Sequence, residues 1–484
     1  MALLLVRTHY SLLTAPASPR ALGEEAVRRG LSHLVLADTN GLYGLLPFAR
    51  ETARLGLQAL FGCEIVHGGR RLVAIARDRV GYGSLCSLLS ERHGVAGPVA
   101  ARRCAEAATD ADREPFDLPR ACERHAAGLW FLCGDPRLLP ELSVRVPADQ
   151  LLVALPRRDD EAAVAAAADP ADEPAGAGAD VADDPERGRK LPDPGRRWPR
   201  ALLRQLAADL GLRCCAVHDV WFPAPEDRAQ HQLFLAVKWN RGLRGGDAAF
   251  DLRGLGQAPA TAHLPTAATW RSGHDDAPDA LQVADEVRAS CTLAFPERAP
   301  PIFPPVDLPP GVDAAARLRQ LVQQGLRRRH GDRPEAQARC ERELAVVEAM
   351  GFAPYFLAVD AIAGLARARG IPFVGRGSAA DSLIAHCLGL TDADPLRYGL
   401  LFERFLNPGR SDLPDIDLDF CWRRRDELID AVYAHFGREH VAMIATYNTC
   451  GARAAYQEAA KVLGLPPAEA SRRSKLLPWH TRPD

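Results

Sequence analysis

The stretch from Ile371 to Phe420 constrains this chain more than any other part of its sequence. An apolar run at 371–374 leads into the loop Gly375-Arg376-Gly377-Ser378, and a helical pattern follows at 379–388. A glycine-rich turn at the start of a helix offers free backbone N–H groups to a phosphate. The order of apolar run, glycine turn and helix therefore predicts a phosphate-binding loop.

A second motif, Asp415-Ile-Asp-Leu-Asp419, lies in the same stretch. Strict alternation is the period of a strand, so Asp415, Asp417 and Asp419 share one face of it. Three carboxylates on one face repel each other, and a divalent cation relieves that repulsion. The alternative is an exposed sheet edge protected by charge. Together with the phosphate loop, the motif predicts nucleotidyl or phosphoryl transfer.

The first part of the chain alternates short apolar runs with helical patterns, which predicts an α/β barrel or a doubly wound sheet. The predicted strands lie at 2–6, 34–37, 57–61, 71–76 and 214–217. Residues 158–197 are rich in Ala, Asp, Pro and Gly and have almost no large apolar side chain. Such a segment buries too little to offset its ordering entropy, so we expect a disordered insertion inside the first domain.

The remaining chain predicts further domains, as expected for 484 residues. A linker is expected at 226–305, with helices at 226–239 and 279–291. Further elements are then predicted in order along the chain: helices at 314–330, 334–350, 355–369 and 423–436, a strand at 440–447, and helices at 452–463 and 467–475.

Composition narrows the partners and the compartment. Sixty basic residues face 62 acidic ones, so nucleic-acid binding would need local basic clusters, such as 327–329 and 472–475, rather than net charge. A solvated helix face is the alternative for each cluster. Twelve cysteines without a C-x-x-C motif indicate neither a disulfide framework nor a zinc motif. No apolar run reaches the length of a membrane span. We therefore expect a cytoplasmic protein without a membrane partner.

Four sequence motifs in the first 225 residues resemble the polymerase-and-histidinol-phosphatase (PHP) domain. They are His9-Tyr-Ser-Leu-Leu13, Leu36-Ala-Asp-Thr-Asn-Gly-Leu-Tyr-Gly44, Gly62-Cys-Glu64 and His218-Asp-Val-Trp221. The resemblance implies a distorted (β/α)7 barrel over 1–225 with a multi-metal phosphoesterase site, in which Asp38, Glu64 and Asp219 match acidic ligands. The family's histidines fall on Leu5, Arg7, Thr39, Arg71 and Trp221. An arginine places a cation where a metal should bind, so we expect a degenerate site without phosphoesterase activity.

Later motifs resemble the palm of bacterial DNA polymerase III α subunits, the C-family polymerases. They are Met350–Phe356, Gly375–Ser382, Leu388–Arg397, Leu400–Pro408, Pro414–Phe420, Ala452–Ala454, Val462–Gly464 and Ser474–Pro478. The resemblance implies a mixed α+β, polymerase beta-like palm over 306–436 and the start of a thumb over 437–484. Asp415 and Asp417 would hold two Mg²⁺ ions, with Asp419 as a third candidate. The residues implied in triphosphate binding are Gly375, Arg376, Gly377, Ser378, Arg404 and Arg410, of which the last two are also reasonable structural arginines.

The resemblance also implies partners. A polymerase of this family acts on primer–template DNA and deoxynucleoside triphosphates, beside other replisome or polymerase subunits, in replication or repair synthesis. Its third catalytic aspartate and its fingers fall beyond residue 484, so we expect activity only where the missing part is supplied, for example by a separately encoded C-terminal half. The second hypothesis is an inactive, truncated paralogue that binds DNA or the replisome. Asp381 stands where many members have glycine, and some error-prone paralogues carry a polar residue there.

Overall fold

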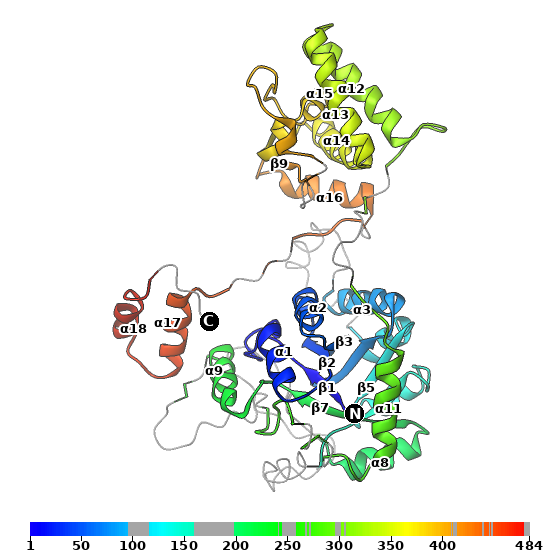
Figure 1. Cartoon of the computed structure of the whole chain (residues 1–484), viewed down its shortest axis with the longest axis vertical. Coiled ribbons are helices and arrows are strands. Elements are labelled where there is room, and N and C mark those ends of the chain that lie inside the picture. The colour runs from blue at the N-terminus through cyan, green and yellow to red at the C-terminus, as the bar shows by residue number, and fades with distance from the viewer. Residues whose placement is uncertain are drawn as a thin grey trace. The chain divides into compact units, whose positions relative to one another are not determined.

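A computed structural model describes residues 1–94, 116–158, 198–240, 258–266, 273–295, 306–407, 414–437 and 449–478, with a few shorter stretches between them. The chain forms two compact units (Figure 1). The first, which we call the barrel unit, comprises 1–96, 114–297 and 448–484, and the second unit comprises 97–113 and 298–447. The candidate Arg410 and all of the insertion predicted at 158–197 except Arg158 lie outside the described residues.

The barrel unit is built on seven strands that close in sequence order. They are β1 (Leu3–Val6), β2 (His33–Thr39), β3 (Gln58–His67), β4 (Arg70–Ala76), β5 (Leu129–Cys133), β6 (Leu151–Leu155) and β7 (Arg213–Val220). β4 runs antiparallel to both of its neighbours, and every other pairing is parallel, including the closing pair β1–β7. The predicted seven-stranded, distorted barrel is therefore confirmed.

Helices cover the barrel from outside. They are α1 (Pro19–Arg28), α2 (Leu45–Arg54), α3 (Arg79–Arg92), α5 (Leu118–Arg124), α6 (Leu139–Ser143), α8 (Arg200–Asp209) and α11 (Pro278–Ser290). Although α11 comes from the segment predicted as a linker, Ala280, Ala284 and Val287 are buried in the barrel's main core. The segment 226–305 therefore contributes a packed helix to the barrel unit. Three more helices belong to this unit, namely α9 (Arg228–Lys238), α17 (Ala452–Val462) and α18 (Pro467–Ser474).

The second unit combines a small antiparallel sheet with helices. Its elements are α12 (Ala314–His330), α13 (Pro334–Ala349), α14 (Ala353–Ala368), β8 (Phe373–Arg376), the 3₁₀ turn η4 (Gly377–Asp381), α15 (Leu383–Cys387), the 3₁₀ turn η5 (Phe402–Arg404), β9 (Asp417–Phe420) and α16 (Arg425–Phe436). Leu344, Phe356 and Phe405 lie at the centre of its core and are fully buried. β8 and β9 pair with each other, which brings together two motifs that lie about forty residues apart.

Three sequence predictions for this unit are wrong in detail. The loop predicted from Gly375 is part of β8, because Gly375 pairs with Leu418. The helix predicted at 379–388 is broken at Ser382, where the backbone is extended. The Ser382 hydroxyl caps the short α15 by accepting a hydrogen bond from the Ala385 N–H. The strand predicted at 440–447 is not formed at 440–444 or 446, the part of it that the structure describes. Ile444 is 90% exposed there, so no packing favours an extended strand.

Among the described residues, no single helix is long and apolar enough to cross a membrane. The bent pair α13 and α14, which meet at 111°, passes the same test only when taken together and only by length and composition. Both helices contribute buried residues to the core of the second unit.

Candidate active site

The predicted aspartates and the glycine loop meet across β8 and β9. Arg376 lies directly opposite Asp417, and Val374 lies opposite Asp419. Side chains of directly opposed residues project to the same face of a sheet, so Arg376 shares a face with both aspartates. On the other face, Leu418 packs against the core. Asp415 comes just before β9, at the position that continues the alternation.

Arg376 bridges two of the carboxylates. Its Nε lies 2.8 Å from Asp419 Oδ2, and its Nη1 lies 3.4 Å from Asp417 Oδ2. The hydrogen bond with Asp419, followed by the charges of Asp419 and Asp417, raises the pKa of Arg376. The three side chains are 60%, 55% and 42% exposed for Arg376, Asp419 and Asp417 respectively. Ion pairs this exposed stabilise little, so the guanidinium is easily displaced by a metal or drawn to a phosphate.

Two glycines of the loop are required by geometry. A Cβ at Gly375 would overlap the backbone carbonyl oxygen of Leu390, so only glycine lets β8 pass there. Gly377 has φ +70°, and a Cβ on it would lie 3.1 Å from Asp417 Oδ2. The loop backbone therefore runs close beside the central aspartate. Ser378 follows in η4 and is half-buried.

Of the two candidate arginines beyond the loop, the structure describes only Arg404. Its Nη1 lies 3.7 Å from Oδ2 of Asp381, which is buried at the end of η4. The negative charge that the sequence places beside the phosphate loop therefore has a cationic neighbour. The Arg404 side chain is itself 70% exposed.

Two further residues support this site, and no sequence pattern indicated their roles. Tyr355 of α14 accepts a hydrogen bond from the Ile416 N–H at 2.9 Å, which anchors the chain between Asp415 and Asp417. Burial raises the pKa of Tyr355, and the charges of both aspartates add to the shift. The two carboxylates therefore lie close enough to this hydroxyl to act on it electrostatically.

Glu343 of α13 is the second supporting residue. Its buried carboxylate accepts from the Ser382 hydroxyl at 3.0 Å and from the Ile384 N–H at 3.2 Å. Burial raises its pKa, against the opposing effect of Arg339, whose Nε donates to it at 2.9 Å. Arg339 also donates to the Asp381 carbonyl at 2.9 Å. The end of the glycine loop is therefore held by a charged pair from a helix some forty residues earlier.

The barrel has its own cluster of charges, where the PHP family would hold metals. Arg7 contacts Glu64 at 2.6 Å and Asp219 at 3.1 Å, and Arg71 contacts the same two carboxylates at 3.2 Å each. We call these four residues the charge ring. They line a cavity inside the barrel, and the Arg7 guanidinium lies 4.3 Å from the centre of the Trp221 ring.

The centre of the charge ring is buried, and each of its two carboxylates pairs with both arginines. Arg7 and Glu64 are 0% and 1% exposed. Burial alone would raise the pKa of Glu64, but Arg7 and Arg71 outweigh it and lower that pKa. Thr39, at a position where the family has histidine, donates to Glu64 Oε2 at 2.9 Å. Two guanidinium cations therefore occupy the place of metal ions, and these residues do not fit a multi-metal centre.

Asp38, the third acidic candidate in the barrel, lies outside the charge ring. Its carboxylate accepts from the Thr8 N–H at 2.7 Å and from the hydroxyls of Thr8 and Ser11 at 2.8 Å each. Burial raises its pKa to about 6, against the effect of these donors. Asp38 is thus committed to holding the loop after β1.

Comparisons with known proteins match the start of the barrel unit and the second unit to two different domain families, and the second match extends into α17 and α18 of the barrel unit. Residues 4–137 match the PHP domain, and residues 316–483 match the "Bacterial DNA polymerase III alpha NTPase domain". The chain is 33% identical over 491 residues to a protein named "Error-prone DNA polymerase" from Symbiobacterium thermophilum, and 31% identical over 520 residues to one from Nocardia farcinica. These alignments cover 99% and 96% of this chain and 42% of each relative. The chain therefore spans about two fifths of the length of the curated relatives it matches.

Proposed function

Because this chain belongs to the family of bacterial DNA polymerase III α subunits, we propose that its second unit is the nucleotide- and metal-binding part of a DNA polymerase palm. The reaction is template-directed deoxynucleotidyl transfer to primer–template DNA. The name that the relatives carry favours an error-prone, repair type of synthesis.

One observation carries the proposal: the β8–β9 register sets Arg376 opposite Asp417, with Gly377 beside the same carboxylate. Nucleotidyl transfer needs metal-binding carboxylates next to donors for the triphosphate, and this pairing brings both kinds of group to one face. Stability alone does not call for three acids on an exposed strand face.

Asp415 and Asp417 are the residues that would hold two Mg²⁺ ions, since carboxylate oxygens are the ligands that Mg²⁺ prefers. When bound, such ions activate the primer 3′-hydroxyl and neutralise charge on the reacting phosphate. Arg376 exchanges its exposed carboxylate partners for phosphate oxygens, which its planar fork binds well. Gly377 and Ser378 add backbone and hydroxyl donors to the triphosphate.

Arg404 and Arg410 supply further positive charge to the phosphates in this proposal. The pairing of Arg404 with Asp381 supports a second role for Arg404, because it offsets an acid beside the loop. Asp381 is therefore compatible with an anionic substrate.

The barrel contributes structure rather than catalysis in this proposal. Saturation of Glu64 and Asp219 by two arginines supports the absence of phosphoesterase activity. Other replisome or polymerase subunits are the expected partners, including a separately encoded C-terminal half that supplies the remaining palm carboxylate and the fingers. The expected compartment is the cytoplasm.

The test is primer extension with Mg²⁺ by this chain, alone and with the C-terminal part of such a polymerase supplied. We expect extension in the second reaction, and we expect Asp415→Ala to abolish it. Glu335→Ala, at an exposed acid of α13 in the same unit, is the matched control and should extend normally. Extension that survives Asp415→Ala would overturn the assignment of the palm.

The same reactions test the alternative of a binding module. DNA binding without extension, equal for the wild type and Asp415→Ala with every partner supplied, would establish that alternative in place of the enzyme.

A further inference from the structure

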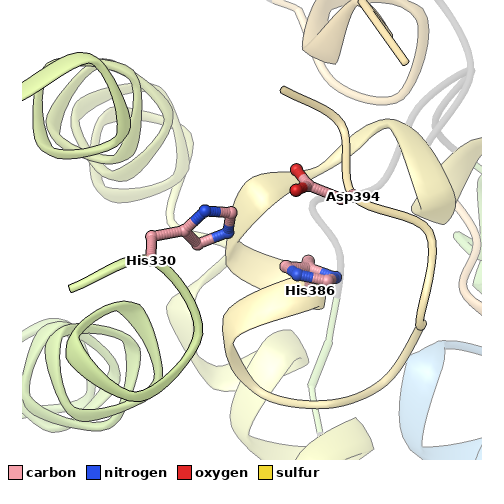
Figure 2. Close-up of side chains that lie close together, drawn as sticks. All are labelled: His330, His386 and Asp394. Atoms are coloured by element: carbon pink, nitrogen blue, oxygen red, sulfur yellow. The ribbon is translucent and has the colours of Figure 1, made fainter. Parts of the chain in front are cut away.

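We propose that His330, His386 and Asp394 form a structural zinc site in the second unit (Figure 2). The three residues come from different parts of the chain. His330 is the last residue of α12, His386 lies in α15, and Asp394 lies in the loop that follows α15. This proposal does not depend on the proposed polymerase function.

The geometry suits one small cation. Each of the three residues offers one ligand atom, and these atoms all lie within 4.8 Å of one another. The carboxylate of Asp394 points toward the two imidazole rings, whose centroids are 5.3 Å apart. Ligands of a tetrahedral zinc ion, at roughly 2.1 Å from the metal, are about 3.4 Å apart. A small contraction of the cluster therefore brings all three ligands onto one ion.

The two histidines have nitrogen atoms that nothing else satisfies. His330 Nε2 and His386 Nδ1 are buried and have no hydrogen-bond partner, and both residues are more than nine-tenths buried. Buried polar atoms are nearly always paired, so two orphaned nitrogens beside one carboxylate point to a missing ligand. His386 also forms a hydrogen bond with the Thr391 backbone. A second bond of this kind fixes the tautomer in metal-binding histidines and leaves the other nitrogen free to bind.

Packing holds the three ligands in place. A Cβ at Gly325 would overlap the carbonyl of Cys387, so α12 and α15 touch through their backbones next to His386. Asp394 Oδ1 accepts from the Leu396 and Arg397 N–H groups at 2.9 and 3.3 Å. This turn fixes the carboxylate and uses one of its oxygens, which leaves Oδ2 for the metal.

The donor set selects zinc over the magnesium proposed for the palm. Two imidazoles and one carboxylate suit zinc and its transition-metal neighbours, whereas Mg²⁺ and Ca²⁺ take oxygen ligands. The C-terminal end of α12 adds a negative dipole end beside His330. Arg329 opposes a cation at the cluster, but its Nη2 lies 3.6 Å from Asp392, which offsets part of that charge. Water completes the four ligands.

A metal here ties α12 and α15 to the loop that leads toward η5. Since α15 directly follows the phosphate loop, the ion would stabilise the base of that loop without touching substrate. The proposed role of the zinc ion is therefore structural, even though water supplies its fourth ligand.

The experiment measures zinc directly on the whole chain. Protein stripped with a chelator is mixed with one equivalent of ZnCl₂ in excess Mg²⁺, passed through gel filtration and analysed for bound zinc. We expect one retained zinc per chain, a higher melting temperature, and, with Co²⁺ instead, visible absorption typical of tetrahedral nitrogen and oxygen ligands. His330→Asn, His386→Gln and Asp394→Asn should each weaken zinc binding by roughly 100-fold or more, since even partners of ligands contribute about 10- to 100-fold.

These substitutions keep the neighbouring hydrogen bonds. The side-chain amide introduced by His386→Gln would still reach the Thr391 backbone, and the amide introduced by Asp394→Asn would keep the oxygen that caps the turn. His435→Gln, a histidine of α16 outside the cluster, and Asp417→Asn are the controls, and both should retain zinc as the wild type does. All eleven described cysteines are free, so a Co²⁺ spectrum with a thiolate charge-transfer band would assign the metal to cysteine and overturn the proposal. Equal zinc retention by a variant that carries all three substitutions would also overturn it, as would loss of zinc from the wild type.

Discussion

The barrel unit and the second unit both set arginines against carboxylates, yet the two clusters differ in burial. In the charge ring, Arg7 and Glu64 are 0% and 1% exposed, and two arginines face two acids at 2.6–3.2 Å. On β8 and β9, Arg376 and Asp419 are 60% and 55% exposed. The residue types are the same, but their surroundings are not.

Burial decides what each cluster can do. A buried ion pair is costly to break, because the remaining charge has no water to solvate it. An exposed pair exchanges partners at little cost. The charge ring is thus fixed as part of the fold, while the carboxylates beside Arg376 can exchange this partner for another. In the barrel, two arginines neutralise Glu64 and Asp219, which are two of the three acids that match ligands of the PHP family.

The largest expected effect is on catalysis at the exposed cluster. Asp417→Asn should lower primer extension at least ~1000-fold, equivalent to about 4 kcal/mol of transition-state stabilisation. The melting temperature should stay within a degree or so of the wild type, because the side chain is 42% exposed and its ion pair is weak. Single-turnover extension with all polymerase parts present, and thermal unfolding of the same samples, measure both. Marked destabilisation by Asp417→Asn would mean that the exposed cluster stabilises the fold, as the charge ring does.

In the charge ring we expect the opposite result, a loss of stability without a loss of activity. Glu64→Gln leaves the Arg7 guanidinium buried without its main partner and should cost roughly 3–5 kcal/mol in the free energy of unfolding of the barrel. Polymerase activity of the folded protein should be unchanged. Thermal and denaturant unfolding measure the loss, and Glu24→Gln, at an exposed ion pair of α1, is the control with little effect.

A double variant sharpens this result. Arg7→Met with Glu64→Met removes both charges and should cost much less than the sum of the single changes, because no unpaired charge is left. Additive losses would mean that the two residues do not act as a pair.

Asp38 gives the barrel a pH dependence of its own. Its pKa is about 6 in the folded protein and 3.8 ordinarily. A raised carboxyl pKa means that the folded state binds the proton more tightly, so the stabilising contribution is present below pH 3.8 and is lost as pH rises through 6. Each unit of pKa difference is worth about 1.36 kcal/mol, so the difference between 3.8 and about 6 lowers the free energy of unfolding by about 3 kcal/mol. Asp38→Asn should lack this component, so barrel unfolding of wild type and variant between pH 4 and 7 should diverge. Parallel pH profiles for the wild type and the variant would contradict this role of Asp38.

The sequence predicted the elements better than the contacts between them. Alternation in Asp-Ile-Asp-Leu-Asp predicts a strand face with three acids, and the register agrees for Asp417 and Asp419. Arginine at positions 7 and 71 predicted a cation in place of metal ligands. The charge ring forms because the barrel brings β1, β3, β4 and β7 together, and no local sequence pattern encodes that arrangement.

The same limit applies to the supporting residues and to the zinc cluster. Glu343 and Tyr355 act on segments about forty and sixty residues away. Cysteine spacing indicated no zinc motif, and the cluster of His330, His386 and Asp394 has no motif spacing because three separate segments supply it. Only packing of α12 against α15 brings its two histidines together.

The smallest effect on stability, and the finest test of the comparison, is expected at Arg376. Arg376→Gln should leave the melting temperature unchanged, in contrast to loss of Arg7. It should raise the KM for deoxynucleoside triphosphates roughly 10-fold, because one charge-assisted contact to phosphate contributes about 1.5–3 kcal/mol. It should also strengthen Mg²⁺ binding without nucleotide, since Asp417 and Asp419 lose a competing cation. Extension kinetics and a Mg²⁺ titration measure the two shifts, and Arg369→Gln, whose guanidinium bonds the Leu365 carbonyl, is the control. If Arg376 exchanges between the carboxylates and a phosphate, the variant should bind nucleotide more weakly and Mg²⁺ more strongly. Weakening of both would mean that Arg376 holds the strand pair together, as Arg7 holds the barrel.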